Sequence, residues 1–472
     1  MRSIAERLAT VAAVAVLTAG CASVDPQQGI SRVEVNLAER LDSPVAWTSD
    51  QADVRATLQR LLAQPLTPDA AVRIALLNNR HLRADLARLG ITQADLVQSR
   101  LPANPSLSLG VLSGADGTIV EGSVVQDLIS LLGLSAQRKI ANAQADGAHA
   151  QVSQRVLELA AQVRAQYFTV VGDAQALELA QQVADSTLAA AELAGRQLQA
   201  GTLSRREHTL QQAFHAQTVL ELAQAQARLA ADRERLTQLL GLWGADTGWE
   251  VPERLPELPQ QLPDPALVEQ TAVSQRLDLL AARMDAEAAA RAAHLTRQFR
   301  YLSALGLGVS YKREADGGRF YGPEIELALP LFDQGQPRIA RAQAEAAAAA
   351  AAFEALAIDV RTQARRARGA LGAAADAVRH HERTLLPLQQ SIVEETLKFY
   401  NGMLVGAYDL LLARQAQVQT ARAYVEARKA FWHAWVDLER ALGGALPLPA
   451  AKKPQSDAPS PAVPMPHGQH QE

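Results

Sequence analysis

The sequence predicts a mainly α-helical fold with a small β part, built from one structural unit that occurs twice in tandem. Three observations predict it. Short segments recur at a spacing of about 200 residues, so that Ala115-Asp116-Gly117 returns as Ala315-Asp316-Gly317 and Leu239-Leu240-Gly241 is echoed by Ala441-Leu442-Gly443. In each copy, a segment of alternating polarity leads through an Asp-Gly turn into a long alanine-rich tract. Only 4% of the residues are aromatic, which is typical of long helices packed through small side chains.

The N-terminal residues 1–20 are predicted to be a signal peptide. A weakly positive start and a short apolar run end in Leu17-Thr18-Ala19-Gly20, followed by Cys21. Small residues before a cysteine resemble a bacterial lipoprotein signal, which implies cleavage before Cys21 and acylation of that residue. The alternative is an ordinary secretory signal beside an incidental cysteine. Ala22 and Ser23 include no aspartate of the kind that resembles an inner-membrane retention signal, which favours the outer membrane.

Residues 21–68 are predicted to form an N-terminal extended segment. They are polar and contain three helix-interrupting prolines, Pro44, Pro65 and Pro68. Apolar residues at helical spacing then predict a helix over residues 69–98, which Pro102 ends.

Each copy then contains a predicted β-hairpin, formed by residues 106–111 with 119–125 and by residues 305–311 with 321–329. In the second hairpin one face is apolar and the other is small or acidic. This pattern fits a barrel wall between lipid and water, and a hairpin packed on a soluble core shows the same alternation. Four strands cannot close a barrel and open edges are not tolerated in lipid, so several chains would have to pool their strands.

Long helical hairpins follow the strands. A proline-free tract over residues 135–199 predicts a helix on the order of 100 Å long, which returns antiparallel through residues 204–240. The second copy repeats this over residues 338–400 and 409–442, with a kink predicted at Pro387. The predicted architecture is a long antiparallel α-helical coiled-coil barrel, with β-hairpins that contribute to a transmembrane β-barrel.

The predicted domain boundaries follow from this order. The two repeats cover residues 69–250 and 266–446. Between them, residues 251–265 hold five prolines, which predicts a stiff extended connector. Residues 447–472 are rich in Pro, Ser and Gln and are predicted to be a disordered tail.

Composition excludes some classes of partner and activity. Lys and Arg (46) nearly balance Asp and Glu (50), and no basic run carries interleaved aromatic residues, so we expect no nucleic-acid partner. After Cys21 no apolar stretch reaches the roughly 18 residues of a membrane-spanning helix, so strands would have to make any membrane crossing. Cys21 is the only cysteine, which excludes an intramolecular disulfide. No nucleophile elbow, phosphate loop, HExxH or CxxC signature is present, and we expect neither an enzyme nor a cofactor.

Several motifs resemble those of the TolC-like outer-membrane efflux proteins, in particular the lipoprotein branch that serves RND-type drug or heavy-metal efflux systems. Leu329-Pro330-Leu331-Phe332-Asp333-Gln334-Gly335 matches the family's Leu-Pro-Leu-Phe-Asp-x-Gly segment, and Leu131-Leu132-Gly133 is its worn counterpart in the first copy. Arg276-Leu277-Asp278-Leu279 is similar to the family's Arg-Pro-Asp-Leu start, and Asn78-Asn79 with Leu82 resembles the matching start of the first copy. The resemblance covers roughly residues 69–443.

The turns of the two helical hairpins also resemble the family. Its Tyr-x-x-Gly-x-x-Ser-x-x-Asp spacing is followed at two places: Leu198, Gly201, Ser204 and Glu207, and Tyr400, Met403, Gly406 and Asp409. Reversing a helical hairpin in a few residues requires a positive φ, which favours glycine. The second copy has Met403 at the glycine step, and Gly402 lies one residue away.

By resemblance these turns form the periplasmic tips that meet an adaptor protein and constrict the closed channel. Rings of Glu207 and Asp409 would then favour cations and hold the tip shut through partners such as Arg205 or Arg414. The alternative is that both acids are solvated helix N-terminal residues, stabilised by the macrodipole.

The resemblance implies a passive homotrimer in the outer membrane, in contact with its lipid, that works with a periplasmic adaptor (a membrane fusion protein) and an inner-membrane pump. Two alternatives stay open, a periplasmic adaptor and a structural coiled-coil lipoprotein. The cargo, drugs or metal ions, is left open. The tail residues Met465, His467 and His470 either bind metal ions or are simply solvated, and His380-His381 point in different directions, so no metal site is predicted. Phe431, Trp432 and Trp435, with Tyr424, are expected to pack at the wider part of the bundle.

Overall fold

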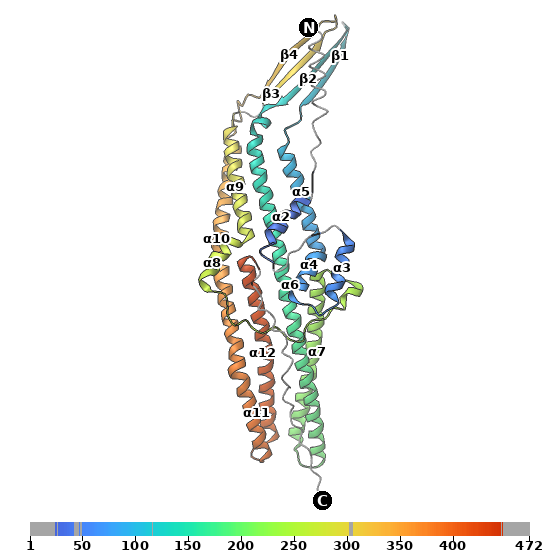
Figure 1. The fold of residues 1–472 in the computed structure, drawn as a ribbon, viewed down its shortest axis with the longest axis vertical. Coiled ribbons are helices and arrows are strands. Elements are labelled where there is room, and N and C mark those ends of the chain that lie inside the picture. Colours follow the sequence, from blue (N-terminus) through green and yellow to red (C-terminus); the bar gives the residue numbers. More distant parts are fainter. Residues whose placement is uncertain are drawn as a thin grey trace.

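The computed structural model describes residues 24–25, 27–41, 47, 50–115, 117–301, 305–444 and 446. The predicted signal peptide, Cys21 and the tail residues 447–472 lie outside this part of the chain. The molecule is a long rod, with a β-sheet at one end and two helical hairpins at the other (Figure 1). No helix in the described segments is both long and apolar enough to span a bilayer.

The four predicted strands form one antiparallel sheet in the order β1-β2-β3-β4. The strands are β1 (Ser106–Gly114), β2 (Gly117–Asp127), β3 (Leu305–Arg313) and β4 (Arg319–Leu327). The strand prediction is confirmed, and the structure adds that β2 pairs with β3, which joins the two copies of the repeat in one sheet. β1 and β4 are the two edges.

Two long helical hairpins descend from the sheet, as predicted. α6 (Leu128–Gln199) is one helix of 72 residues and returns as α7 (Arg205–Leu240). The second hairpin consists of α10 (Gln336–His380), α11 (Leu386–Asn401) and α12 (Ala407–Leu442).

The start of the first hairpin and the break in the second have local causes. α6 begins earlier than predicted, because the Asp127 side chain caps it by accepting from the Ile129 N–H at 2.9 Å. The break expected at Pro387 takes the form of a π-helical segment, His381–Leu385, between α10 and α11. A proline lacks the N–H of a regular helical bond, and this local change of winding accommodates it.

The helices beside the sheet include two corrections. The single helix predicted over residues 69–98 is two helices, α4 (Pro68–Asn78) and α5 (Arg80–Arg100). The break falls at Asn79, whose side-chain oxygen accepts from the backbone of His81 and Leu82. An asparagine that caps the next helix competes with continuation of the previous one. In the second repeat the corresponding helices are α8 (Pro265–Gln275) and α9 (Leu277–Gln298).

The prediction that residues 21–68 are extended was wrong. They contain α2 (Gln27–Leu37) and α3 (Gln51–Leu62). Val33 and Leu37 of α2 are buried in the main core, so this short helix is stabilised by packing that its own composition does not reveal. Pro68 lies in the first turn of α4, where a proline is well tolerated, and does not break a helix.

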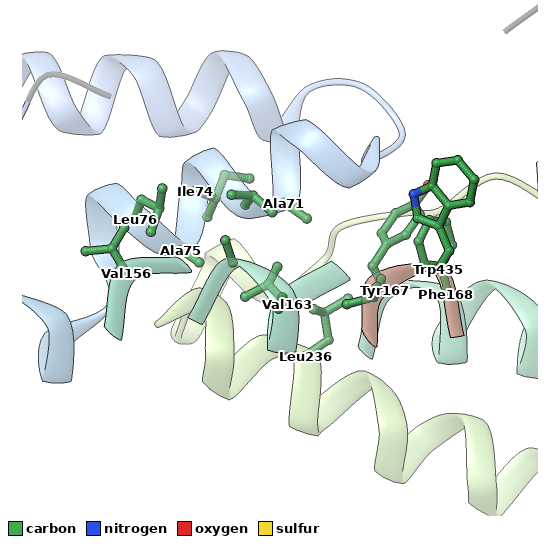
Figure 2. Close-up of a cluster of buried hydrophobic side chains, with 14 of the residues drawn as sticks. Ala71, Ile74, Ala75, Leu76, Val156, Val163, Tyr167, Phe168, Leu236 and Trp435 are labelled. Atoms are coloured by element: carbon green, nitrogen blue, oxygen red, sulfur yellow. The ribbon is translucent and has the colours of Figure 1, made fainter. Parts of the chain in front are cut away.

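The core lies at the waist of the rod, where α4, α6, α7 and α12 meet (Figure 2). Phe168 of α6 stacks on Trp432 of α12 with ring centroids 4.8 Å apart, and Trp432 also contacts Phe431 and Trp435. The Tyr167 hydroxyl donates to the Leu66 carbonyl at 2.9 Å. The predicted aromatic packing is therefore confirmed and holds helices of both repeats together.

Candidate functional site

One face of the sheet is apolar across all four strands. The register aligns Leu109 with Gly122, Gly122 with Tyr311, and Tyr311 with Tyr321. Leu109 and Tyr321 are 75% and 72% exposed, although both are large and apolar. A continuous exposed apolar surface of this kind marks contact with lipid or another protein.

The opposite face of the sheet is polar. Ser108 and Ser123 are hydrogen-bonded through their hydroxyl groups at 2.8 Å. On the same face, the Lys312 ammonium lies 3.5 Å from the Glu121 carboxylate. Strands with one apolar and one polar face are typical of a wall between lipid and water.

The dimensions of the sheet match a bilayer. Its strands contain nine to eleven residues. At about 3.3 Å per residue they extend roughly 30–36 Å, which is the length of a membrane-spanning strand. The two edges, β1 and β4, have no partner strand in the described chain.

At the waist, the C-terminus of α7 abuts the N-terminus of α5. Asn78 Nδ2 donates to the Gly241 carbonyl at 2.6 Å and to the Leu240 carbonyl at 3.3 Å, and Asn79 Nδ2 donates to the Leu239 carbonyl at 2.9 Å. Gly241 has φ 68°, and a Cβ there would lie 2.8 Å from the Asn78 carbonyl oxygen. The motif residues Asn78-Asn79 and the repeated Leu-Leu-Gly segment are therefore two halves of one joint.

The second repeat contains the equivalent joint. Gly443, with φ 82°, ends α12 against the start of α9, where a Cβ would lie 3.0 Å from Arg276 Cα. The Arg276 guanidinium binds the Asp278 carboxylate and donates to Gln363 Oε1 at 2.7 Å. A cation at a helix C-terminus is favourable for the helix dipole. This joint explains why the two motifs recur at the same spacing in both copies.

A buried ion pair links α6 to α12 beside these joints. Arg164 Nη1 donates to both Glu439 carboxylate oxygens at 3.0 Å, and both side chains are 5% exposed. Arg164 also donates to Asp69 at 3.1 Å, and the Trp435 indole donates to Glu439 at 3.0 Å. Burial raises the pKa of Glu439, and the Arg164 guanidinium opposes that shift. Sequence reasoning missed this pair, because its members are 275 residues apart.

A second buried pair lies further along the same two helices. Lys429 Nζ donates to Asp173 Oδ1 at 2.7 Å, and the two side chains are 12% and 2% exposed. Burial raises the pKa of Asp173, which the Lys429 ammonium opposes. The aliphatic stem of Lys429 lies where a Cβ on Gly172 would be, so glycine is required there for the close approach.

The connector between the repeats is held by side chains from the helices. Residues 251–264 form neither helix nor strand. Arg428 donates to the Leu255 and Pro256 carbonyls at 2.6 and 2.8 Å, and Arg368 donates to the Pro263 carbonyl at 2.7 Å. A proline-rich segment has carbonyls without a ladder of partners, and side-chain donors satisfy them in this connector.

At the far end of the rod, the α6–α7 turn has the predicted glycine geometry. Gly201 has φ 74°. The Ser204 hydroxyl accepts from the Glu207 N–H at 3.2 Å, while the Glu207 carboxylate accepts from the Ser204 N–H and hydroxyl at 3.0 and 2.7 Å. These hydrogen bonds lower the pKa of Glu207. The arrangement is a capping box at the start of α7.

The α11–α12 turn repeats this geometry with different residues. Met403 takes the left-handed conformation at the step of Gly201, with φ 58°, and Gly402 does not. The Gly406 N–H donates to the Asp409 carboxylate at 3.1 Å, as the Ser204 N–H does to Glu207. Both acids therefore cap their helices, which is the alternative that the sequence left open.

The two turns adjoin and border a groove. A Cβ on Gly406 would lie 4.0 Å from Glu207 Oε1, and Arg206 lies 5.9 Å from the Tyr408 ring centroid. The groove has a volume of about 570 Å³ and is lined by α6, α7, α11 and α12. Among the described residues of this single chain, the two acids form no ion pair with Arg205 or Arg414, and Arg414 donates to Gln417 at 3.0 Å.

No group of three or more His, Cys, Asp and Glu side chains in the described part of the chain is placed to hold a metal ion. His380 ends α10 and His381 begins the π-helical segment. Met465, His467 and His470 lie outside the described residues.

Comparison with known proteins adds the family. A family model described as outer membrane efflux protein matches residues 71–242. The chain is 27% identical over 405 residues to the cobalt-zinc-cadmium resistance protein CzcC of Cupriavidus metallidurans, covering 84% of this chain and 95% of that protein. Its fold is similar to a membrane protein from Pseudomonas aeruginosa (TM-score 0.70, 21% identity, 86% of this chain and 98% of that chain) and to the outer-membrane channel OprN (TM-score 0.69, 20% identity, 87% and 95%). The chain belongs to the outer membrane efflux protein family.

Proposed function

We propose that the protein is the outer-membrane channel of a tripartite efflux system, a passive exit duct across the periplasm and the outer membrane. One observation carries this proposal. A sheet of bilayer height, apolar on one face and polar on the other, continues directly into a helix of 72 residues. At 1.5 Å per residue this helix is on the order of 110 Å long, which is the scale of a periplasmic tunnel.

The open sheet edges argue for a homotrimer. Backbone N–H and C=O groups at an edge cannot be left unpaired in lipid, so β4 of one copy would pair with β1 of the next. Three copies would pool twelve strands, enough to enclose a water-filled lumen. The polar face with Ser108, Ser123 and the Glu121–Lys312 pair would line that lumen.

The partners are proposed by the same reasoning. A duct without an energy source depends on a pump, and the end of the rod away from the sheet would be the part that meets a periplasmic adaptor. Met403 and Leu404 at that end are 94% and 72% exposed. The adaptor and the inner-membrane pump would thus complete the system.

Two alternatives make different predictions. A periplasmic adaptor has one helical hairpin flanked by β-rich modules, whereas this chain has two hairpins and one joint sheet. A structural coiled-coil lipoprotein would not require the two-faced sheet. Both would be recovered without detergent once an N-terminal lipid was removed.

The direct test is the mass and conductance of the purified protein. In detergent the particle should contain three chains of 50.6 kDa, and it should conduct ions in a planar bilayer. A monomer that stays in solution without detergent and leaves the bilayer sealed would contradict the proposal.

We also propose that Glu207 and Asp409 form acidic rings at the tip constriction. Glu207→Ala combined with Asp409→Ala would then raise single-channel conductance. Because both acids cap helices, Glu207→Gln with Asp409→Asn is the matched control, which removes the charges but retains hydrogen-bond acceptors. Raised conductance in the alanine pair alone would assign the effect to the caps. Unchanged conductance in both pairs would contradict a gate role.

The cargo we favour is a divalent transition-metal ion. The supporting observation is the similarity to CzcC, which extends over 95% of that cobalt-zinc-cadmium resistance protein. A deletion strain should become sensitive to cobalt, zinc or cadmium salts and retain its tolerance of antibiotics. Sensitivity to antibiotics alone would assign the duct to drug export.

A further inference from the structure

The loop between β4 and α10 exposes three large apolar side chains that the channel wall does not use. Leu329, Leu331 and Phe332 are 69%, 72% and 98% exposed. The loop is nevertheless ordered by its own hydrogen bonds, from the Leu331 N–H to the Leu329 carbonyl at 2.9 Å and from the Gly335 N–H to Asp333 Oδ1 at 2.8 Å. A fixed loop that presents apolar groups to solvent suggests an absent partner.

The same feature occurs at every junction between the sheet and the helices. Exposed apolar residues follow α5, begin α6, follow α9 and follow β4: Leu101 (43%), Leu131 (40%), Leu132 (64%), Tyr301 (55%), and the loop residues Leu329, Leu331 and Phe332. We call these seven residues the collar. In Figure 1 the junctions lie together at one level, where the four strands give way to the long helices.

Arginines accompany the collar. Arg300 lies over the Tyr301 ring, with its guanidinium carbon 4.3 Å from the ring centroid. Arg138 donates to the Arg100 carbonyl at 2.7 Å beside Leu101, and Arg338 lies 4.0 Å from Asp333. Apolar and aromatic side chains mixed with arginine are typical of the boundary between acyl chains and headgroups, where each side chain can reach its preferred medium.

The topology favours lipid over a neighbouring subunit as the partner. A neighbour would approach along the open edges β1 and β4. The junctions at Leu131, Leu132 and Tyr301 belong to β2 and β3, which lie in the middle of the sheet, so edge contacts do not cover them. In addition, Leu329 continues the alternation of Ile325 and Leu327 on the apolar face of β4, which are 70% and 48% exposed.

We propose that the collar lies in the interface of a phospholipid leaflet, with the loop residues Leu329, Leu331 and Phe332 inserted among the upper acyl chains. The collar would fix the depth of the sheet in the bilayer, and therefore the level from which the helices extend. This inference rests on the proposed function, because it requires that the sheet spans a membrane.

Nitroxide labels on single cysteines test the inference. Phe332→Cys would be made in a Cys21→Ser background and reconstituted in vesicles of phosphatidylethanolamine and phosphatidylglycerol. Collision rates with oxygen, which concentrates in acyl chains, and with a water-soluble nickel chelate report depth. Matched labels at Leu109, in the middle of the apolar sheet face, and at Met403, at the far end of the rod, provide the two limits.

The label at Phe332 should collide severalfold more often with oxygen than with the nickel chelate, at a depth shallower than Leu109. Equal exposure to nickel at Phe332 and Met403 would overturn the proposal, and so would exclusion of both reagents, which indicates burial against a subunit. If Leu109 is also exposed to nickel, the proposed channel itself fails. If only Phe332 is, the collar fails and the channel stands.

Substitution provides a second measurement. Phe332→Asp should reduce the fraction of protein that inserts into these vesicles severalfold, because the carboxylate opposes entry of the loop into the acyl region. Phe332→Trp should retain insertion, and Met403→Asp should leave it unchanged. Equal insertion of the aspartate and tryptophan variants at position 332 would contradict an anchoring role.

Discussion

Met403 and Gly201 take the same left-handed backbone conformation at equivalent steps of the two hairpin turns, with φ values of 58° and 74°. The hydrogen bonds agree as well. The Thr202 N–H donates to the Gln197 carbonyl and the Leu404 N–H to the Phe399 carbonyl, both at 2.9 Å. The second turn thus keeps the geometry without the residue type that favours it.

Met403→Gly should therefore stabilise the second turn. A left-handed conformation costs an L-residue about 1–2 kcal/mol, of which glycine's greater unfolded entropy returns roughly 0.5–1 kcal/mol. We expect a net gain of about 0.5–1 kcal/mol, seen as slower amide exchange around residues 399–406. Gly201→Ala is the mirror experiment and should speed exchange in the first turn. Faster exchange in Met403→Gly would contradict the assignment.

The capping box at Glu207 should persist below the usual titration range of glutamate. Hydrogen bonds from the Ser204 hydroxyl and N–H lower the pKa of Glu207 in the folded protein. Its contribution is therefore present above the unfolded pKa and is lost as the pH falls through the lowered folded pKa. Exchange protection of the first turn of α7, corrected for intrinsic rates, should fall only in that acidic window. Ser204→Ala should move the fall to higher pH, and an unchanged midpoint would show that the Ser204 hydroxyl does not lower the pKa of Glu207.

The Arg164–Glu439 pair should be costly to break on one side only. Glu439→Leu leaves the Arg164 guanidinium, 5% exposed, without its buried carboxylate, which costs about 3–5 kcal/mol. Arg164→Met combined with Glu439→Leu removes both charges and should recover much of that loss. Thermal loss of helical circular dichroism measures both. A double variant that is less stable than Glu439→Leu would show that the charges themselves hold the waist.

Gly172 and Gly195 of α6 should respond oppositely to alanine. A Cβ at Gly172 would displace the Lys429 stem and leave Asp173 buried without its ammonium partner. At Gly195 the nearest atom is His208 Nε2 at 3.7 Å, so alanine fits and adds up to about 1 kcal/mol of helix propensity. Gly172→Ala should lower the midpoint of thermal unfolding and Gly195→Ala should maintain or raise it. Equal midpoints would contradict the close-approach role of Gly172.

Local patterns predicted most of the elements. The alternation in β3 and β4 and the proline-free tract of α6 are properties of consecutive residues, so they were readable from the sequence. α2 was missed because it is short and stable only when Val33 and Leu37 pack on the core. The break at Asn79 was missed because its capping side chain interrupts a helical pattern that otherwise continues.

The contacts between the two repeats could not be predicted. The pairing of β2 with β3, the Arg164–Glu439 pair and the Lys429–Asp173 pair each join residues that are far apart in the chain. Spacing within a segment contains no information about such partners. The motif residues Asn78-Asn79 and Gly241 were visible as repeated segments, but their role as one joint required the three-dimensional fold.

The most direct test of the central claim is disulfide cross-linking between the open edges of the sheet. In a Cys21→Ser background no other thiol is present, and Ser108→Cys on β1 would be combined in turn with Gly322→Cys, Glu324→Cys or Glu326→Cys on β4, all on the polar face. If β4 of one copy pairs with β1 of the next, one of the three combinations should give dimers and trimers on a denaturing gel and no larger species. Only monomers in all three combinations, or a ladder that extends beyond three chains, would contradict a closed barrel of pooled strands.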